Sequence, residues 1–551
     1  MSGRYLLAVL LRAWLVSALQ TQTHGDSHVQ LDEALVVGTA EGLTESFLGI
    51  PYAHAPVGDL RLRLPQLIDS YNGTINATAY GNQCFQQSAT FSGDIPSEVV
   101  EGLETIIAVY TPNLDVPESE DCLNLNVVRP ANVSQHEKLP VLFWIYGGGF
   151  TGGSNAMALY NGSKIVQRSI EIGEPVIWVA ANYRLNAFGF LGGREVMEGG
   201  IGNLGLQDQR TALRWVQNFI PSFGGDPDRV TIWGESAGSI SVFFQLTANY
   251  GNTEGLFRAG IMSSGSSVPT REVTDLDVQD TYDFVIQQVG CSNATDTLAC
   301  LRTAPAESIL AAVNNTPSPE GFQGLATPYM PRADGVFVTR RPQELVEEGI
   351  LADVPFIIGD TQDEGTLFSL GSLNITTEQE LGDYLKMFWF PGASSRDVQS
   401  ILTLYPSDPA EGSPFGTGSA NAFTPQYKRI AAIEGDMFFH APRRQVLDRV
   451  SSKQVTYNFL SARMNVSGLG YAHGTDLINA LGPGDMTDYF IRFVRHLDPN
   501  GGSAPHWPPY NTSARRTLQF NDGSTPLTVT ADTERLAGTD ALLDLSLRFP
   551  F

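Results

Sequence analysis

Short, continuous runs of apolar residues recur along this chain, with helical patterns between them. The runs occupy residues 140–146, 175–181, 230–233 and 354–359. A run that is apolar at every position fits a strand covered on both faces, as in a parallel sheet. Residues 206–216 carry the apolar spacing of one helix face. This alternation predicts an α/β fold with a large central, mostly parallel β-sheet flanked by helices.

Residues suited to chemistry directly follow three of these runs. They are the glycines 147–149, Ser236 and the segment after Gly359. The carboxyl ends of parallel strands lie at one edge of a sheet, where ligands and catalytic groups collect. We therefore expect these three segments to meet there.

The most informative of them is the Gly-x-Ser-x-Gly pattern at 234–238, which contains Ser236. It lies between an apolar run and a segment rich in small and apolar residues. A serine on a sharp strand-to-helix turn needs flanking glycines, because the chain passes close to itself there. The pattern predicts a nucleophilic serine, although a chain with 55 glycines can contain such a match by chance.

The glycine run 147–149 fits an oxyanion hole, in which N–H groups must reach a carbonyl oxygen without an intervening side chain. We assign the donors to Gly148, Gly149 and Ala237. A tight turn after the strand is an equally good reading of the run taken alone.

A base and an acid must complete such a site, and in this fold they follow the serine in the order acid, then histidine. Of the histidines after Ser236, only His473 lies among small and turn-forming residues, which suit a loop over a cleft. The acid comes from the segment 359–366. Three carboxylates compete there, at Asp360, Asp363 and Glu364, and their spacing does not separate them.

Composition fits one large globular domain. The 551 residues contain 42% hydrophobic and 17% charged residues, and no repeat or flexible linker divides them. We expect a single catalytic domain over residues 30–551 with loop insertions. The net charge of −25 argues against nucleic-acid binding, and no metal-ligand cluster is visible, so no metal or other cofactor is expected.

The start of the chain resembles a secretory signal over residues 1–18, with Arg4, an apolar stretch at 6–15 and small residues at 16–18. No later segment is apolar enough for a transmembrane helix. Four cysteines permit two disulfides, and Cys291 and Cys300 bracket a short loop. Glycosylation sequons begin at Asn72, Asn76, Asn132, Asn161, Asn293, Asn314, Asn374, Asn465 and Asn511. Together these features predict a secreted, extracellular glycoprotein.

Further motifs make the chain resemble the type-B carboxylesterase/lipase family, the cholinesterase-like branch of the α/β-hydrolases. The matching stretches are residues 47–53, 119–126, 223–227, 234–238, 363–365, 470–476 and 507–510. The resemblance implies an α/β-hydrolase fold, Glu364 as the triad acid and His473 as the base. It is nearest to secreted fungal lipases and sterol esterases, which implies the disulfides Cys84–Cys122 and Cys291–Cys300. Tyr146 stands where animal esterases usually have histidine.

The loop 85–121 is the segment that we expect to influence which ester the protein accepts. It contains apolar residues at the spacing of an amphipathic helix, with glutamates at other positions. The apolar residues are Ile95, Val99, Val100, Leu103, Ile106, Ile107 and Tyr110. In similar fungal lipases this loop is a mobile lid that meets the lipid surface. A helix packed permanently on the body fits the pattern equally well.

The expected function is a carboxylic ester hydrolase that acts through an acyl-enzyme, on apolar esters of the lipase or carboxylesterase type. The alternative is a catalytically silent, cholinesterase-like adhesion or binding protein. Relatives of that kind typically lose the nucleophile, whereas this chain has a competent residue at each catalytic position. The expected partner is a small-molecule or lipid ester, with contact to a lipid interface. Acyl length, alcohol preference and oligomeric state stay open.

Overall fold

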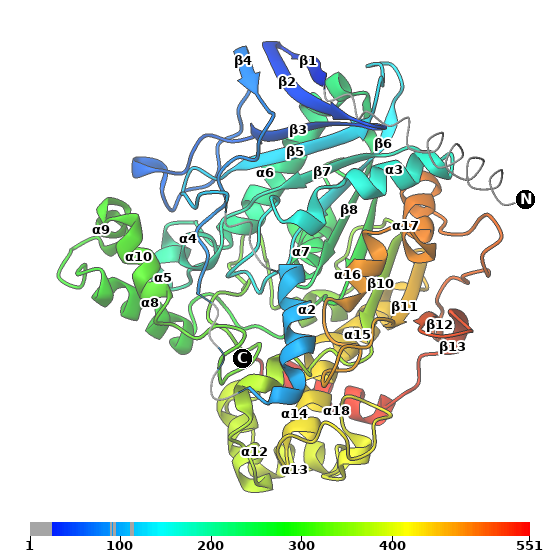
Figure 1. The fold of residues 1–551 in the computed structure, drawn as a ribbon. Helices are drawn as coiled ribbons and strands as arrows, with labels where there is room; N and C mark the ends of the chain where they lie inside the picture. Colours follow the sequence, from blue (N-terminus) through cyan, green and yellow to red (C-terminus); the bar gives the residue numbers. More distant parts are fainter. Residues whose placement is uncertain (1–24, 89–90, 92–94, 111–114) are drawn as a thin grey trace, which may run out of the picture.

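A computed structural model describes residues 25–88, 91, 95–110 and 115–551. The predicted signal sequence at 1–18 lies outside these residues, as does part of the loop 85–121. At the centre is a 13-stranded sheet (Figure 1). Its strands are β1 (Gly25–Leu31), β2 (Glu33–Glu41), β3 (Thr44–Pro51), β4 (Asn72–Asn76), β5 (Asn124–Pro130), β6 (Leu139–Ile145), β7 (Ile177–Ala181), β8 (Gly225–Glu235), β9 (Ala259–Ser263), β10 (Phe356–Thr361), β11 (Thr456–Ala462), β12 (Arg516–Asn521) and β13 (Leu527–Ala531).

The sheet is parallel in its middle and antiparallel at both ends. The spatial order is β1-β2-β3-β5-β7-β6-β8-β9-β10-β11-β12-β13, and β4 pairs with β2. Every neighbouring pair from β7 to β12 is parallel, whereas β1 to β7 and the last pair, β12 and β13, run antiparallel. The prediction of a large, mostly parallel sheet is confirmed.

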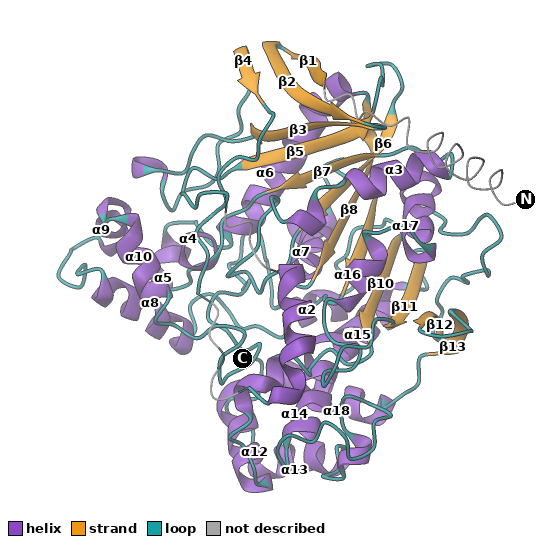
Figure 2. Cartoon of the chain, viewed as in Figure 1, coloured by secondary structure: helices purple, strands orange, loops and turns teal. Residues whose placement is uncertain are grey.

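Helices cover the sheet and form two outlying clusters (Figure 2). They are α2 (Val100–Tyr110), α3 (Ser163–Glu171), α4 (Asn186–Phe190), α5 (Arg194–Glu198), α6 (Leu204–Phe219), α7 (Ala237–Gly251), α8 (Leu276–Gln288), α9 (Thr297–Thr303), α10 (Ala306–Val313), α11 (Pro342–Glu347), α12 (Glu378–Tyr384), α13 (Ser395–Leu404), α14 (Tyr427–Gly435), α15 (Ala441–Val450), α16 (Thr475–Ala480), α17 (Asp485–His496) and α18 (Leu536–Arg548). Figure 1 shows α8–α10 at one side and α12, α13, α14 and α18 at the end away from β1 and β2.

Burial follows the predicted pattern in the central strands. Every residue of β5, β6, β7, β9 and β10 is buried, as expected when both faces of a strand are covered. Helices α3 and α17 pack together, as do α6 and α7, and both pairs contact the central strands. The predicted helix at 206–216 lies within α6. Stacked Trp144 and Trp178, with ring centroids 5.6 Å apart, add aromatic area to this core.

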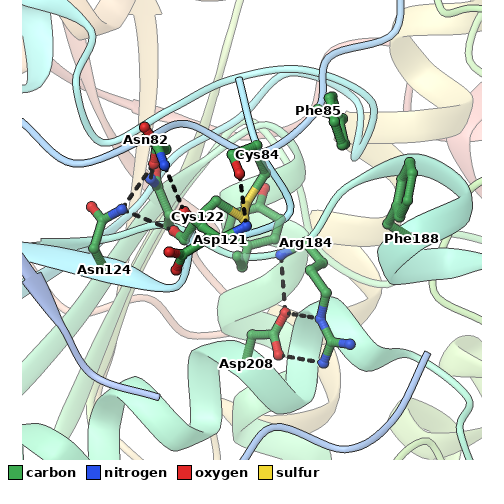
Figure 3. Close-up of a disulfide and its surroundings, with 12 residues drawn as sticks. Asn82, Cys84, Phe85, Asp121, Cys122, Asn124, Arg184, Phe188 and Asp208 are labelled. Atoms are coloured by element: carbon green, nitrogen blue, oxygen red, sulfur yellow. Dashed lines mark hydrogen bonds and ion pairs between the residues drawn. A yellow bond between two sulfur atoms is a disulfide. The ribbon is translucent and has the colours of Figure 1, made fainter. Parts of the chain in front are cut away.

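Two disulfides join the chain to itself. Cys84 bonds to Cys122 and closes the base of the loop 85–121, and Cys291 bonds to Cys300 between α8 and α9. Figure 3 shows Asn82 beside the first disulfide, donating to the carbonyl of Asp121 and accepting from the amide of Asn124. These contacts fix both ends of the loop against β5.

No helix among the described residues is long and apolar enough to span a membrane.

Candidate active site

Ser236 lies on a sharp turn between β8 and α7. Its backbone has φ 56° and ψ −126°, a conformation that non-glycine residues rarely adopt. A side chain at Gly234 would come 2.2 Å from the backbone of Gly238, and one at Gly238 would come 2.0 Å from the carbonyl oxygen of Ile145. Both glycines are therefore required by the close passage of the chain. The N–H of Ser236 donates to the carbonyl of Ser263 on β9 over 2.9 Å, which anchors the turn to the sheet.

The glycine run leads directly past this turn. A Cβ on Gly147 would lie 2.8 Å from the Cβ of Ser236, so only glycine lets the two segments approach. Gly148 and Gly149 have φ of 106° and 62°. Among the described residues, none accepts a hydrogen bond from the N–H of Gly148, Gly149 or Ala237. N–H groups without an acceptor, one of them at the start of α7, can donate to a developing negative charge.

Tyr146, just before the glycines, holds the start of this loop. Its hydroxyl donates to the carbonyl of Tyr183 over 3.1 Å, and the hydroxyl of Tyr183 donates to the carbonyl of Tyr146 over 2.8 Å. The two rings stack at 4.5 Å. This reciprocal pair fixes the backbone directly before the glycine run.

His473 and Glu364 form a short, buried hydrogen bond. Nδ1 of His473 lies 2.5 Å from Oε2 of Glu364, and both residues are about 1% exposed. The other oxygen of Glu364 accepts the N–H of Thr361 over 2.6 Å, which orients the carboxylate. Nε2 of His473 lies 3.3 Å from Oε1 of Glu235, the residue before Ser236. The histidine therefore lies beside the serine turn.

Three carboxylates set the electrostatics of this histidine. Burial alone lowers the pKa of His473, but Glu364, Glu235 and Asp476 outweigh burial and raise the pKa to about 9. Asp476, in the first turn of α16, is itself fully buried. Burial, and then the charges of Glu235 and Glu364, hold its pKa well above the usual range. Asp476 therefore resists ionisation beside the histidine, and Glu364 and Glu235 are the main groups that favour the imidazolium form.

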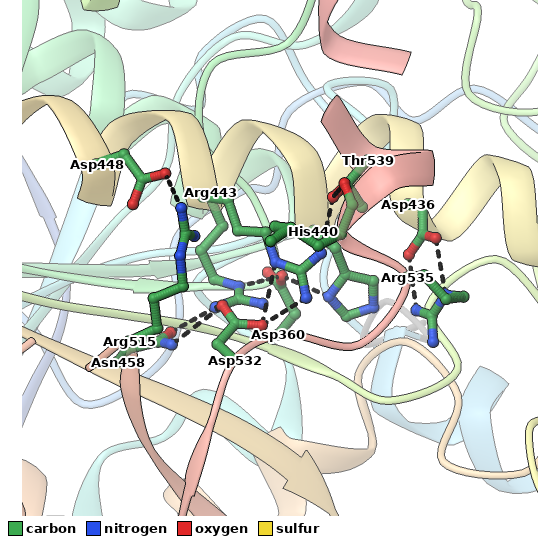
Figure 4. Close-up of polar contacts among 12 residues, drawn as sticks. Asp360, Asp436, His440, Arg443, Asp448, Asn458, Arg515, Asp532, Arg535 and Thr539 are labelled. Carbon is green, nitrogen blue, oxygen red and sulfur yellow. Dashed lines mark hydrogen bonds and ion pairs between the residues drawn. The ribbon is translucent and has the colours of Figure 1, made fainter. Parts of the chain in front are cut away.

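The structure separates the three acids that the sequence left in competition. Asp360 lies 3.0 Å from Nδ1 of His440 and forms an ion pair with Arg443 at 2.6 Å (Figure 4). It belongs to a charged network that also includes Asp532.

Asp363 instead accepts hydrogen bonds from two other segments of the chain. One oxygen accepts the hydroxyl of Ser413 and the N–H of Phe415, each over 2.8 Å. The other accepts the N–H of Tyr471 over 3.0 Å. Asp363 therefore fixes the loop that carries His473 next to the loop that carries Glu364, and only Glu364 reaches the imidazole.

Aromatic rings that the sequence did not single out lie against His473. The ring centroids of Phe368 and Phe439 are 5.1 Å and 5.0 Å from that of the histidine. Phe368 comes four residues after Glu364, on the same loop. Phe439 comes from the segment between α14 and α15, and nothing in its local sequence marks it. These rings make one side of the site apolar.

Helix α2 of the loop 85–121 packs close to the histidine. Val99, Leu103 and Ile106 are buried, while the glutamates at 98, 101 and 104 are exposed. The hydroxyl of Ser467 donates to the carbonyl of Glu98 over 3.2 Å. The helix also contacts α16, which follows His473. The predicted helix is present. Of its predicted apolar residues, Val99, Leu103 and Ile106 are buried and Val100 is exposed, whereas the side chains of Ile107 and Tyr110 lie outside the described part of the chain.

The asparagines of all nine predicted sequons are exposed. No group of three or more His, Cys, Asp and Glu side chains that could hold a metal ion occurs in the part of the chain that the structure describes.

Comparison with known proteins identifies the family. Residues 25–537 match the carboxylesterase family. "Secreted lipase 1" of Botryotinia fuckeliana is 43% identical over 503 residues, covering 88% of this chain and 87% of the relative. "Secreted triacylglycerol lipase LIP1" of Gibberella zeae is 40% identical over 506 residues, covering 88% and 85%.

Among solved structures, that of Aspergillus niger EstA superposes with a TM-score of 0.80 at 28% identity, covering 95% of this chain and 99% of that one. The α/β-hydrolase fold implied by the motifs is thus confirmed. With the family match over most of the chain and the secreted relatives, it follows that this chain belongs to the carboxylesterase family and is a secreted carboxylic ester hydrolase.

Proposed function

We propose that Ser236, His473 and Glu364 form a catalytic triad that hydrolyses apolar esters through an acyl-enzyme. The observation that carries this proposal is the buried 2.5 Å contact between Nδ1 of His473 and Glu364, formed beside the strained turn of Ser236. A carboxylate in that position selects the tautomer whose Nε2 can accept a proton, and it stabilises the imidazolium that results.

The reaction proceeds in two halves. The Ser236 hydroxyl oxygen bonds to the ester carbonyl carbon while His473 takes the hydroxyl proton. The N–H groups of Gly148, Gly149 and Ala237 stabilise the oxyanion. The bond to the alcohol then breaks, and His473 returns its proton to the departing oxygen. Water, deprotonated by the same histidine, adds to the acyl-enzyme and releases the acid and the free serine.

Two observations support an apolar ester as the substrate. Phe368 and Phe439 line the histidine with aromatic carbon. The Gibberella zeae relative is a triacylglycerol lipase by name. Hydrolysis rates across p-nitrophenyl esters of increasing acyl length, with a triglyceride and a cholesteryl ester alongside, would define the preference. A preference for short acetyl esters over all longer ones would contradict an apolar substrate.

Replacement of the nucleophile tests the triad. Ser236→Ala should abolish esterase activity and labelling by a fluorophosphonate probe, while the circular dichroism spectrum stays unchanged. Ser546→Ala is a matched control, because Ser546 is also buried but lies on α18, where its hydroxyl donates to the carbonyl of Leu543. Turnover retained by Ser236→Ala, or lost equally in the control, would end the assignment.

We further propose that α2 and its loop act as a lid. The disulfide Cys84–Cys122 holds the ends of the loop while its middle can move. Opening would expose the apolar side chains of Val99, Leu103 and Ile106. Covering that surface with lipid would stabilise the open form by about 25 cal/mol per Å² of apolar area removed from water. The rate on a triglyceride should therefore rise steeply once the ester exceeds its solubility. A rate that follows only the dissolved concentration would contradict the lid.

A further inference from the structure

Glu434 is a fully buried carboxyl group that the triad does not use. It lies near the end of α14, with 0% of its surface exposed. One oxygen accepts the N–H of Leu325 over 3.2 Å, and the other accepts the hydroxyl of Ser369 over 2.8 Å. In the described part of the chain it forms no ion pair with a cation. Burying an ionised carboxylate without a counter-ion costs free energy, so a carboxyl group at such a position calls for an explanation.

The first contact belongs to a segment that lies against the oxyanion loop. Leu325 ends the stretch 318–325, which also contains Pro319. A Cβ placed on Gly149 would lie 2.6 Å from Cγ of Pro319, so the two segments are in close contact. The position of Gly149 therefore depends on where this stretch lies.

The second contact belongs to the segment that lies against the base. Ser369 follows Phe368, whose ring centroid is 5.1 Å from that of His473. A Cβ on Gly371 would lie 2.1 Å from the carbonyl oxygen of Gly321, so this segment also packs against the stretch 318–325. Glu434 joins the two where they meet.

We propose that Glu434 is a positioning residue for ester hydrolysis. By bonding Leu325 and Ser369 at once, it holds the stretch 318–325 against the oxyanion loop and Phe368 against His473. This inference rests on the proposed triad. It adds a residue that touches neither the substrate nor the reacting atoms, and acts through the two segments.

Burial favours the neutral form of Glu434, whereas the two hydrogen bonds that it accepts favour the ionised form. Burial raises the pKa of Glu434 to about 8, and the hydrogen bonds from Ser369 and Leu325 only partly oppose the rise. The titratable groups that face it are the buried phenols of Tyr384 and Tyr427, whose pKa values its charge helps to raise. Neither phenol supplies a positive charge. Glutamine has nearly the same shape and does not ionise: its Oε1 can accept the N–H of Leu325, and its amide N–H can donate to the hydroxyl oxygen of Ser369, which then accepts.

Two substitutions at this position separate positioning from packing. Glu434→Leu fills the space but leaves the Leu325 N–H and the Ser369 hydroxyl without the carboxyl. On a soluble p-nitrophenyl ester, at a temperature below the onset of unfolding, it should lower kcat about tenfold with little change in KM, because small displacements of catalytic groups are costly. Glu434→Gln should keep kcat within about twofold of wild type. An unchanged kcat in folded Glu434→Leu would overturn the proposal.

Asp334→Leu is the matched control for loss of a buried carboxyl. Asp334 is also buried and accepts hydrogen bonds from Val336, Val338 and Asn203, none of which belongs to the two segments. It should lower the melting temperature without changing kcat. An equal loss of kcat in this control would show that general destabilisation explains the result, and would overturn the proposal.

A milder variant keeps the test decisive if Glu434→Leu does not fold. Ser369→Ala removes one contact only and should lower kcat about threefold; an unchanged value would contradict the proposal. The pH profile gives a second readout, since ionisation of Glu434 above pH 8 should lower the ratio of wild-type kcat to that of Glu434→Gln. Profiles that coincide above pH 8 would contradict the proposal.

Fluorophosphonate labelling of the wild type separates the triad hypothesis from the positioning hypothesis. Absence of label contradicts the triad, whereas normal labelling together with unchanged kcat in the Glu434 variants contradicts only the positioning role.

Discussion

The backbone at Ser236 is strained, and its close neighbours hold it in that conformation. The serine has a positive φ, and its turn exists only because glycines at 234 and 238 admit neighbouring backbone at 2.2 Å and 2.0 Å from where a Cβ would be. Strain of this kind costs roughly 1–3 kcal/mol and persists where the surroundings enforce it. Here the hydrogen bond to Ser263 and the buried sheet enforce it.

The pH dependence of the activity should report the carboxylates around His473. The base must be neutral to accept a proton, and Glu235 helps to hold its pKa above the usual value. Glu235→Gln removes one negative charge, so the pKa falls and the acidic limb of kcat/KM should move to lower pH by roughly one unit or more. The pH–rate profile on a soluble ester measures this shift.

A second glutamate–histidine pair provides the control. Glu174 lies 3.0 Å from His496 on the surface, so Glu174→Gln removes the same charge without touching the site. Its acidic limb should coincide with that of wild type. If Glu235→Gln moves the limb upward or leaves it in place, the carboxylates do not control the base as described.

At the scale of elements, the loops at the carboxyl edge of the sheet bring the candidate catalytic residues together. The segments after β6, β8 and β10 meet there, as their order after apolar runs predicted. Asp363 then joins the loop after β10 to the loop before α16, which the sequence could not show because its partners Ser413 and Tyr471 are 50 and 108 residues away. Contacts of such separation depend on the whole fold rather than on local pattern.

The two disulfides should differ in their effect on stability. Cys84 and Cys122 are 38 residues apart, and Cys291 and Cys300 are 9 apart. In the chain-entropy description, removal of the first costs about 4 kcal/mol and of the second about 2.5 kcal/mol. Urea unfolding of the double variants Cys84→Ser/Cys122→Ser and Cys291→Ser/Cys300→Ser measures the difference. A larger loss for the short loop would mean that native contacts, not loop length, dominate.

Across the whole molecule, a buried charged network connects the C-terminal region to the catalytic strands. Asp532, which follows β13, pairs with Arg443 at 2.7 Å and Arg444 at 2.5 Å on α15. Arg443 in turn pairs with Asp360 at the end of β10 (Figure 4). The strand that leads to Glu364 is therefore fixed to an element more than 150 residues later.

Loss of the charge on Asp532 should destabilise the protein strongly. Asp532→Asn leaves two buried guanidinium groups short of a partner and should lower the free energy of unfolding at pH 7 by about 3 kcal/mol. Burial raises the pKa of Asp532, but Arg443 and Arg444 outweigh it and hold the pKa well below the usual range. The stabilisation is thus complete at neutral pH and is lost as the pH falls below about 4.

Unfolding at pH 7 and at lower pH measures both effects. The difference between wild type and Asp532→Asn should shrink as the pH falls. Asp544→Asn is the control, since Asp544 pairs only with Arg548 at the surface and should change stability little. A difference that is constant with pH would show that the ionisation of Asp532 does not contribute.

Local sequence pattern was enough to predict the α/β class and the candidate nucleophile and oxyanion donors, because apolar runs and glycines at strand ends act through near neighbours. The family was suggested by the resemblance of several short motifs. Spacing left Asp360, Asp363 and Glu364 in competition and the family resemblance implied Glu364, but the contact of Glu364 with His473 is visible only in the tertiary structure, because the three acids differ in their distant partners. The same holds for Phe439 and Glu434, whose neighbours come from other parts of the chain and leave no local signal.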